Sequence, residues 1–273
     1  MKSSNTLTNS QKELNQIQSN NIFSNLKSRF ILKNIFNNLS RKQSLHIIHY
    51  NKNIQKRLNI TINDFKEYSE IYSPIEIELI PSKNKSGKFI NITNLQKEKY
   101  YHIYFNDGKI EINRNYLKEN EQIKKIKIII EYQVTSFEDL FHSCKCIESI
   151  NFKSFIRKTI TNMSAMFYGC SSLKEINLSK FNTDNVTNMG FMFSGCTSLE
   201  ELNLSNFNTD KVTFMDYMFS GCSSLKKLVI SNFSIGNSTD IDSLFDGCSY
   251  KFMNKIKAYI INIKKEILMN LIK

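Results

Sequence analysis

The sequence has few long apolar runs, and we expect neither a secretory signal nor a membrane anchor in it. Its first 21 residues, MKSSNTLTNSQKELNQIQSNN, are polar and contain no apolar region of the kind that a secretory signal carries. No stretch approaches the roughly 18 uninterrupted apolar residues that a membrane-spanning helix needs. We therefore expect an intracellular, cytoplasmic protein with a disordered tail at residues 1–21 and no transmembrane segment.

The motifs of common catalytic and metal sites are also missing. There is no glycine-rich phosphate loop, no Ser/His/Asp constellation and no HExxH sequence. Cys144 and Cys146 are close together, but no second Cys or His pair follows them, as a zinc site would require. His46 and His49 lie three residues apart on an expected helix, yet no Cys or carboxylate in that segment completes a metal site. We expect no enzymatic activity, no cofactor and no metal.

Positive charge is abundant but is not concentrated. The formal net charge is +12, which by itself would suggest a nucleic-acid or membrane partner. Residues 134–250, however, carry nine Lys or Arg against twelve Asp or Glu, a balance of −3 that leaves +15 for the rest of the chain. The basic residues outside 134–250 form no single dense run, so we interpret them as a solvated surface and expect no nucleic-acid partner.

What the sequence has is a repeat of 26 residues. The segment VTNMGFMFSGCTSL at 186–199 follows ITNMSAMFYGCSSL at 160–173 and precedes VTFMDYMFSGCSSL at 212–225. A period of this length, held at several apolar positions, is typical of a solenoid or another repeat array. The positions that keep the interval most strictly, and that we expect in the core of the repeats, are Cys144, Cys170, Cys196, Cys222 and Cys248, with Phe141, Phe167, Phe193, Phe219 and Phe245.

Each unit divides into two halves. LKEINLSKF at 173–181 has the LxxLxL spacing of the strand half of a leucine-rich repeat. In residues 186–196 the apolar positions are spaced 3, 3, 1 and 3 apart, which favours one face of a short helix. Thr183 or Asp184 would supply its N-cap oxygen, and Gly195 would end it in a left-handed conformation. We expect strand, turn, short helix, turn in every unit, with successive units stacked to bury their apolar faces.

The unit LSNFNTDKVTFMDYMFSGCSSLKKL resembles the BspA-like leucine-rich repeats, in the 26-residue form found in mycoplasma-type lipoprotein domains and in large protist families. The resemblance covers about residues 123–249. It implies an α/β solenoid, a right-handed leucine-rich-repeat superhelix without catalytic activity that binds other molecules, often at cell surfaces as an adhesin. Within it, the shortened step from IKKIKI at 123–128 to the next unit suggests an atypical first repeat, and the last unit departs from the pattern as a C-terminal cap would.

The repeated cysteines and methionines admit more than one interpretation. Stacking would bring the cysteines near enough for disulfides, but their Cβ atoms would point the same way, and free Cys is among the most buried residue types. We expect buried, reduced thiols. The methionines could form a soft binding stripe, but their register with Phe and Cys favours core packing.

The strand residues that alternate with the buried leucines point to the opposite face. They would line the extended concave surface by which solenoids bind partners. Recent duplication of the repeat would also explain their similarity. The candidate protein-binding residues are Asn151, Glu175, Asn177, Ser179, Glu201, Asn203, Ser205 and Lys227.

The flanking regions are less regular. Residues 22–60 predict two helices, with an S-x-x-Q capping box at Ser40–Gln43, and look somewhat like an F-box, which recruits a ubiquitin ligase. The plainer interpretation is a small helical domain. Residues 61–122 predict a small β-rich region that includes a hairpin with its turn at Asp107-Gly108, whose strands would cover the first edge of the repeats.

Residues 250–273 predict a basic amphipathic helix. An apolar stripe begins at Phe252 and Ile256, continues through Tyr259 or Ile260, and would extend to Leu271. A membrane-surface helix is one interpretation, and a capping helix on the last repeat is the other. Together with the repeat region at 123–249, these segments predict a monomeric, non-catalytic protein-binding scaffold. An F-box-like adaptor and a surface adhesin are the alternatives.

Overall fold

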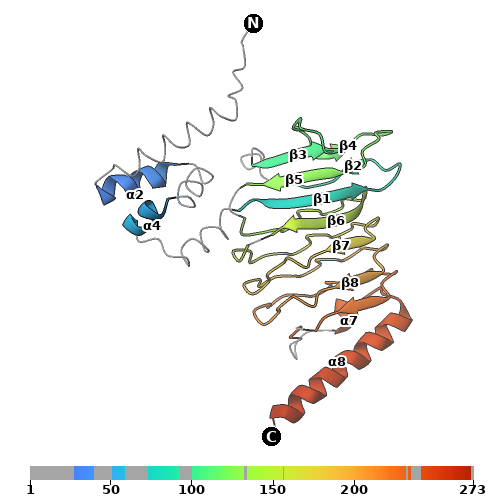
Figure 1. The fold of residues 1–273 in the computed structure, drawn as a ribbon. Helices are drawn as coiled ribbons and strands as arrows, with labels where there is room; N and C mark the ends of the chain where they lie inside the picture. Colours follow the sequence, from blue (N-terminus) through green and yellow to red (C-terminus); the bar gives the residue numbers. More distant parts are fainter. Residues whose placement is uncertain are drawn as a thin grey trace. The chain divides into compact units, whose positions relative to one another are not determined.

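The computed structural model describes residues 28–39, 51–58, 73–92, 100–131, 134–155, 157–231, 233–234 and 241–271. They form nine strands, arranged in open sheets, and four helices. The chain divides into two compact units, residues 1–72 and residues 73–273 (Figure 1). The first unit holds the helices α2 and α4, and the second holds all the described strands together with α7 and α8.

The described residues of the first unit, 28–39 and 51–58, form two short helices within the region 22–60 that was expected to be helical. Ser28 caps α2 (Arg29–Asn38) by accepting a hydrogen bond from the Ile31 N–H, and Asn51 caps α4 (Lys52–Arg57) by accepting one from the Ile54 N–H. Leu32 and Ile54 are fully buried in one small cluster. The expected capping box at 40–43 lies outside the described residues, as do the histidines at 46 and 49.

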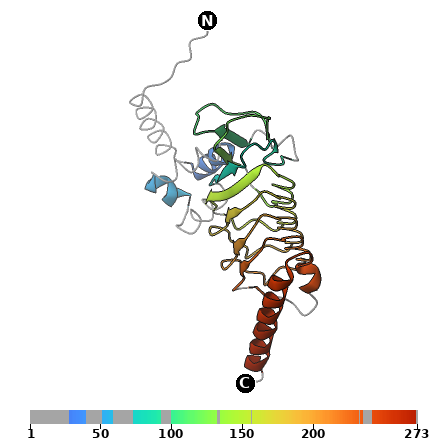
Figure 2. The same ribbon diagram turned by 90° about the vertical axis from the view of Figure 1, so that its right-hand side faces the viewer.

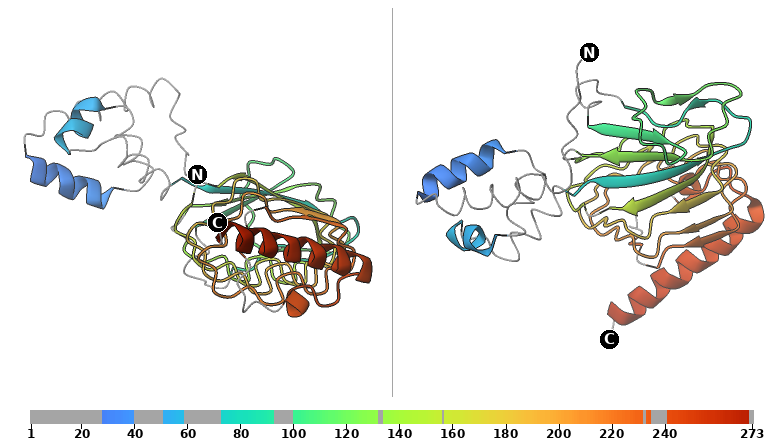
Figure 3. Two further views of the ribbon diagram at one scale, coloured as in Figure 1. Left: turned by 90° about the horizontal axis from the view of Figure 1, so that it is seen from below. Right: turned by 45° about the horizontal axis from the view of Figure 1, so that its top comes forward.

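The second unit begins with a five-stranded sheet of order β3-β5-β1-β6-β7, beside two smaller sheets, β2-β4 and β8-β9 (Figures 1 and 3). Its described helices are α7 (Ile241–Leu244) and α8 (Tyr250–Leu271). The strands are β1 (Ile75–Pro81), β2 (Gly87–Lys88), β3 (Tyr101–Phe105), β4 (Tyr116–Leu117), β5 (Ile126–Ile130), β6 (Ile147–Ser154), β7 (Glu175–Asn177), β8 (Glu201–Asn203) and β9 (Lys227–Val229).

Strand β1 lies between β5 and β6 and is antiparallel to both. It therefore covers the first edge of the repeats, as expected. The prediction that residues 123–128 form the first stacked repeat is wrong, because β1 separates β5 from β6. Ion pairs hold β1 on both sides: Glu76 binds Lys127 of β5 at 2.6 Å and Glu78 binds Lys153 of β6 at 3.3 Å. The sheet thus continues across the domain boundary expected at residue 122.

The turn at Asp107-Gly108 forms as predicted, but the hairpin does not. The Gly108 N–H donates to the Phe105 carbonyl at 2.9 Å, and Asn106 and Asp107 have φ values of 51° and 59°. Residues 109–114 are not a strand, and the partner of β3 is β5 instead. The side chain of Asn106 explains part of this choice, because its Oδ1 accepts hydrogen bonds from the backbone N–H groups of Lys124 and Lys125.

The repeats stack in parallel at an interval of 26 residues. Strand β6 pairs with β7 and β8 with β9, so that Ile150 lies beside Ile176 and Leu202 beside Leu228. A second line of contacts runs through isolated bridges from Ser136 to Asn162, Asn188 and Phe214. Strands form one side of the stack and the turn segments form the opposite side (Figure 2). The periodicity of the sequence is therefore a periodicity of backbone pairing.

The prediction of a short helix at residues 186–196 is wrong. The N–H groups there alternate between two directions, whereas an α-helix would send each one four residues back. One set of N–H groups closes local turns by donating to the carbonyl three residues earlier; the donors are Met192, Ser194 and Cys196. The alternate N–H groups donate instead to carbonyls of the next unit, over 2.7–3.0 Å. These bonds join Met189 to Phe214, Phe191 to Asp216, Phe193 to Met218 and Gly195 to Ser220.

The expected N-cap residue Thr183 also bonds between units. Its Oγ1 donates to the Asn208 carbonyl and accepts from the Asn208 N–H, both at 2.8 Å. Because this hydroxyl is buried and used twice, it serves the stacking of units and caps no helix. Gly195 does adopt the left-handed conformation that was expected, with φ +73°.

The C-terminal helix α8 packs on the last repeat, as the capping interpretation predicts (Figure 3). Phe252, Ile256 and Ile260 are buried, and the Phe252 ring meets the Phe245 ring edge-on at 5.8 Å. The sequence left open whether Tyr259 or Ile260 faces the core, and Ile260 does, because Tyr259 is exposed. Side chains beyond residue 260 lie outside the described part. Among the described residues, no helix has the length and apolar character needed to cross a membrane.

Candidate binding surface

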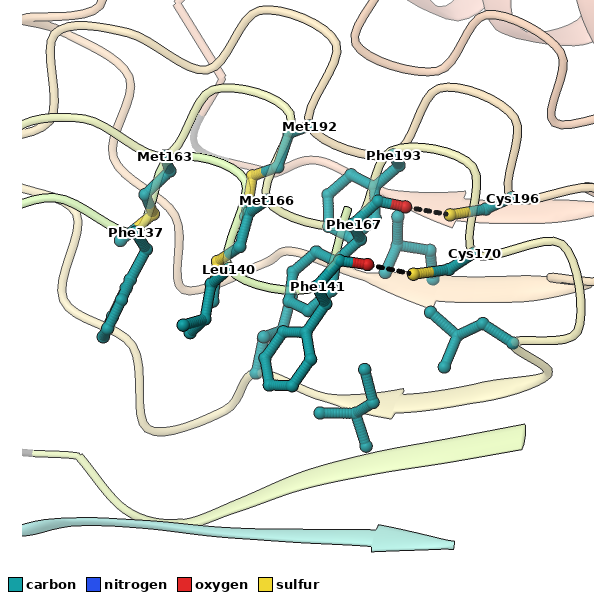
Figure 4. Packing of buried hydrophobic residues seen from close by; sticks show 14 of the residues in the cluster. Phe137, Leu140, Phe141, Met163, Met166, Phe167, Cys170, Met192, Phe193 and Cys196 are labelled. Atoms are coloured by element: carbon teal, nitrogen blue, oxygen red, sulfur yellow. Dashed lines mark hydrogen bonds between the residues drawn. The ribbon is translucent and has the colours of Figure 1, made fainter. Parts of the chain in front are cut away.

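The candidate surface rests on a core in which equivalent side chains stack from unit to unit. Rings of the repeated phenylalanines lie nearly parallel, at 5.7 Å for Phe141–Phe167 and 5.3 Å for Phe167–Phe193 (Figure 4). The next pair, Phe193–Phe219, continues the stack at 5.9 Å. The line ends with Phe245, whose ring lies 5.3 Å from that of Phe219. Such close packing opposes a shift of one unit along its neighbour, so it helps to fix the spacing of the strands and of the side chains that they carry.

The six cysteines are free thiols, and four of them bond to the unit before their own. The Sγ of Cys170 donates to the Phe141 carbonyl at 3.0 Å, and that of Cys196 to the Phe167 carbonyl at 3.2 Å (Figure 4). Cys222 and Cys248 repeat the contact with Phe193 and Phe219. Cys248 is half-buried, whereas Cys144, Cys146, Cys170, Cys196 and Cys222 are buried.

Burial keeps these thiols neutral. It raises the pKa of Cys170 and of Cys222 to about 12, and that of Cys248 to about 11. A neutral thiol is neither a good nucleophile nor a metal ligand. The described residues also hold no group of three or more His, Cys, Asp or Glu side chains that could bind a metal ion. The repeated methionines are buried as well, including Met163, Met189, Met192 and Met218, so they offer no exposed binding stripe.

The predicted contact residues lie together on the outer face of the strands. Ile176 and Leu202 point to the core side of β7 and β8, and the residues on either side of them point outward. Of the predicted set, Glu175, Asn177, Ser179, Glu201, Asn203 and Lys227 are exposed, while Asn151 and Ser205 are half-buried. We call these eight residues the strand face.

Contacts along the strand face join residues 26 positions apart. The amide of Asn177 donates to Asn151 Oδ1 at 3.2 Å, and Lys227 Nζ lies 3.2 Å from a carboxylate oxygen of Glu201. Asn177 and Asn203 also accept hydrogen bonds from the N–H groups of Ser179 and Ser205, which turn the chain away from each strand. The two asparagines therefore have a structural role that the strand pattern alone does not indicate, although Asn-x-Ser after a strand is a recognisable turn signal.

Charged neighbours that sequence reasoning missed widen this surface. Lys174 pairs with Glu148 at 3.1 Å, and Lys226 pairs with Glu200 at 2.7 Å, each across one 26-residue interval. The sequence would have allowed these ion pairs to be predicted, because opposite charges separated by one repeat become neighbours once the units stack. These pairs are exposed, and each contributes little to stability.

The comparisons with known proteins fall on the repeats. A family model described as "Mycoplasma protein of unknown function, DUF285" matches residues 135–259. The repeat region is similar to that family. No curated protein matches the chain. A solved leucine-rich repeat protein from Bacteroides ovatus is 21% identical, with a TM-score of 0.26, over 48% of this chain and 40% of its own. The chain thus spans less than half of that protein's length, and neither match bears on the BspA-like name, which stays a prediction.

Proposed function

We propose that the repeats form a right-handed leucine-rich-repeat solenoid that acts as a non-catalytic scaffold and binds another protein through the strand face. The observation that carries this proposal is the row of exposed polar side chains set at fixed intervals over a continuous buried core. Stacked repeats of this kind create extended surfaces on which each unit contributes the same few positions.

Rigidity supports a recognition role. Parallel pairing sets neighbouring strands about 4.8 Å apart, and the stacked phenylalanines beneath them prevent the rows from shifting. A partner would therefore meet side chains whose backbones are already ordered, which reduces the entropy lost on binding.

The strand face also varies along its length. The row that contains Glu175 and Glu201 is acidic in its middle units and ends at Lys227, where the next position along the strand changes from Asn203 to Val229. Variation on a constant framework allows specificity, because the backbone geometry is kept while the chemistry presented to the partner changes.

The experiment is a paired charge reversal. The variant carrying Glu175→Lys and Glu201→Lys should keep the melting temperature of the wild type, because exposed substitutions usually change stability by less than about 0.5 kcal/mol each. It should lose the partner that proximity labelling in the native cell identifies for the wild-type chain. The control carries Asp184→Lys and Asp210→Lys, which make the same charge change at exposed positions outside the strand face, and should keep that partner.

The same experiment separates the scaffold from the F-box-like adaptor. If the partner still binds the Glu175/Glu201 variant and is lost when residues 22–60 are removed, then the helical region recruits it and the strand-face proposal is wrong.

A further inference from the structure

Aromatic rings gather on the turn side of the repeats, away from the strand face. Tyr168, Phe214 and Tyr217 are 38%, 41% and 40% exposed, and Phe191 is half-buried among them. The Phe191 ring lies 5.1 Å from Tyr217, 6.4 Å from Tyr168 and 6.5 Å from Phe214. We call these four residues the aromatic patch. It spans three successive units.

Two aromatic residues of the patch have a backbone conformation that bulky side chains disfavour. Phe191 and Tyr217 have φ values of 58° and 57°, in the left-handed region that Gly and Asn tolerate and bulky residues avoid. The equivalent positions in the preceding units hold smaller residues, Asp139 and Ala165, in the same conformation. Local stability therefore does not explain the choice of an aromatic residue at these two positions.

Phe214 departs from the repeat in a second way. The equivalent residues Asn162 and Asn188 each accept a hydrogen bond from the N–H two positions later, at 2.9 and 3.0 Å, and so stabilise the turn. A phenylalanine cannot accept that bond. Its ring lies instead over Gly190, where a Cβ atom would come within 2.2 Å of a ring carbon. Departures from a locally favoured pattern are expected mainly at functional sites, and here three of them converge on one patch.

The turn side is also acidic, in contrast to the whole chain. The four turn segments 135–144, 161–170, 187–196 and 213–222 contain Glu138, Asp139 and Asp216 but no Lys or Arg, whereas the chain has a net charge of +12. Asp139 reaches the patch through His142: its carboxylate lies 2.7 Å from Nδ1, and the imidazole ring lies 4.7 Å from the Tyr168 ring. Asp216 is adjacent in sequence to Tyr217. One carboxylate thus reaches the patch at the Tyr168 end, and another belongs to the residue before Tyr217.

We propose that the aromatic patch and its flanking carboxylates bind a basic, amphipathic segment of a partner protein. The methylene stems of Lys or Arg side chains pack on exposed rings while their charged heads reach carboxylates, so this surface is complementary to such a segment. The turn segments that carry these residues form the side of the stack opposite the strands (Figure 2), so the proposal does not depend on the strand face.

The test uses the full chain and a fluorescent peptide of alternating Lys and Leu, with a peptide of alternating Glu and Leu for comparison. Fluorescence anisotropy should show that the Lys peptide binds and the Glu peptide does not, and that added salt weakens the complex. The triple variant Phe191→Asn, Phe214→Asn and Tyr217→Asn should bind the Lys peptide about tenfold more weakly or worse. Its melting temperature should stay the same or rise, because Asn tolerates the left-handed conformation and restores the turn bond at position 214.

The Asp184→Lys and Asp210→Lys variant changes exposed positions outside both the strand face and the aromatic patch, so it is the control for nonspecific charge attraction and should bind the Lys peptide as the wild type does. Equal binding by the triple variant, or equal loss in this control, would overturn the proposal. A fall of several degrees in the melting temperature of the triple variant would show that the rings serve folding instead. Self-association of the wild type that the triple variant abolishes would assign the patch to a second copy of the chain.

Discussion

The thiol of Cys196 donates a hydrogen bond to the carbonyl oxygen of Phe167, 29 residues earlier in the chain. The same contact recurs for Cys170, Cys222 and Cys248 with their own phenylalanines. A cysteine that is held by the unit before it is a stacking residue, which explains why the interval of 26 is kept so strictly. Because such a thiol is buried between units, its reactivity and its ionisation should depend on whether the protein is folded.

The thiols of Cys170, Cys196 and Cys222 should react slowly with a thiol reagent at neutral pH while the protein is folded, and rapidly after denaturation. Their pKa values are raised by burial, so the thiolate fraction in the folded protein is very small. Mass spectrometry of the labelled protein, with and without denaturant, measures this. Disulfides between units in a non-reduced sample, or full labelling of the folded chain, would contradict the assignment.

Alkaline pH should destabilise the protein through the same groups. The pKa of Cys170 and Cys222 rises from about 9 in the unfolded chain to about 12 in the folded one, so the unfolded state releases protons first as pH increases. The contribution is fully present below pH 9 and is lost progressively between about pH 9 and 12. The melting temperature should therefore fall more steeply with pH in the wild type than in a Cys170→Ala, Cys222→Ala variant, whatever the variant's stability at neutral pH.

Replacing Phe193 with Ala should destabilise the protein by about 3–5 kcal/mol, because the ring is fully buried between two parallel neighbours. Tyr168→Ala removes a ring of similar size that is more than one third exposed, and should cost much less. Chemical denaturation of both variants gives the comparison. Similar losses for the two would mean that the stacked rings do not form a continuous core.

Gly195→Ala should cost about 1–2 kcal/mol, because a residue with a side chain is strained at φ +73°. The new Cβ would also lie 3.3 Å from the Cα of Gly169 in the preceding unit, so the two units could not keep their present separation without a shift. Thermal unfolding of the variant measures this loss, and an unchanged melting temperature would contradict the close stacking of Gly195 on Gly169.

Much of the repeat was visible in the sequence, because each apolar position of the core recurs in five units. The short helix was predicted wrongly since a spacing of 3, 3, 1 and 3 suits successive turns as well as a helix. What decides between them is that the N–H groups of Met189 and Phe191 find carbonyls in the next unit. That choice depends on contacts between units, which a local pattern does not contain.

The insertion of β1 between β5 and β6 was missed for a similar reason. Ile126 and Ile128 continue the repeat spacing, and only the antiparallel pairing of Glu78 with Lys127 and Asn151 reveals that another strand lies between. The exposed side of the repeats was easier to predict, because strand alternation separates Glu175 from Ile176. Whether a partner binds there depends on chemistry that the fold alone does not contain.

The measurement that tests the account most directly is the thermal stability of two deletion variants. Removing residues 183–208 takes out one whole unit and leaves flanking units that still match in their backbone ladders, their phenylalanines and their cysteines. That variant should unfold cooperatively with only a modest loss of melting temperature. Removing residues 183–195 alone shifts the following units by 13 residues, places strands against turn segments, and should cost far more. Equal melting temperatures for the two variants would contradict the stacking of 26-residue units.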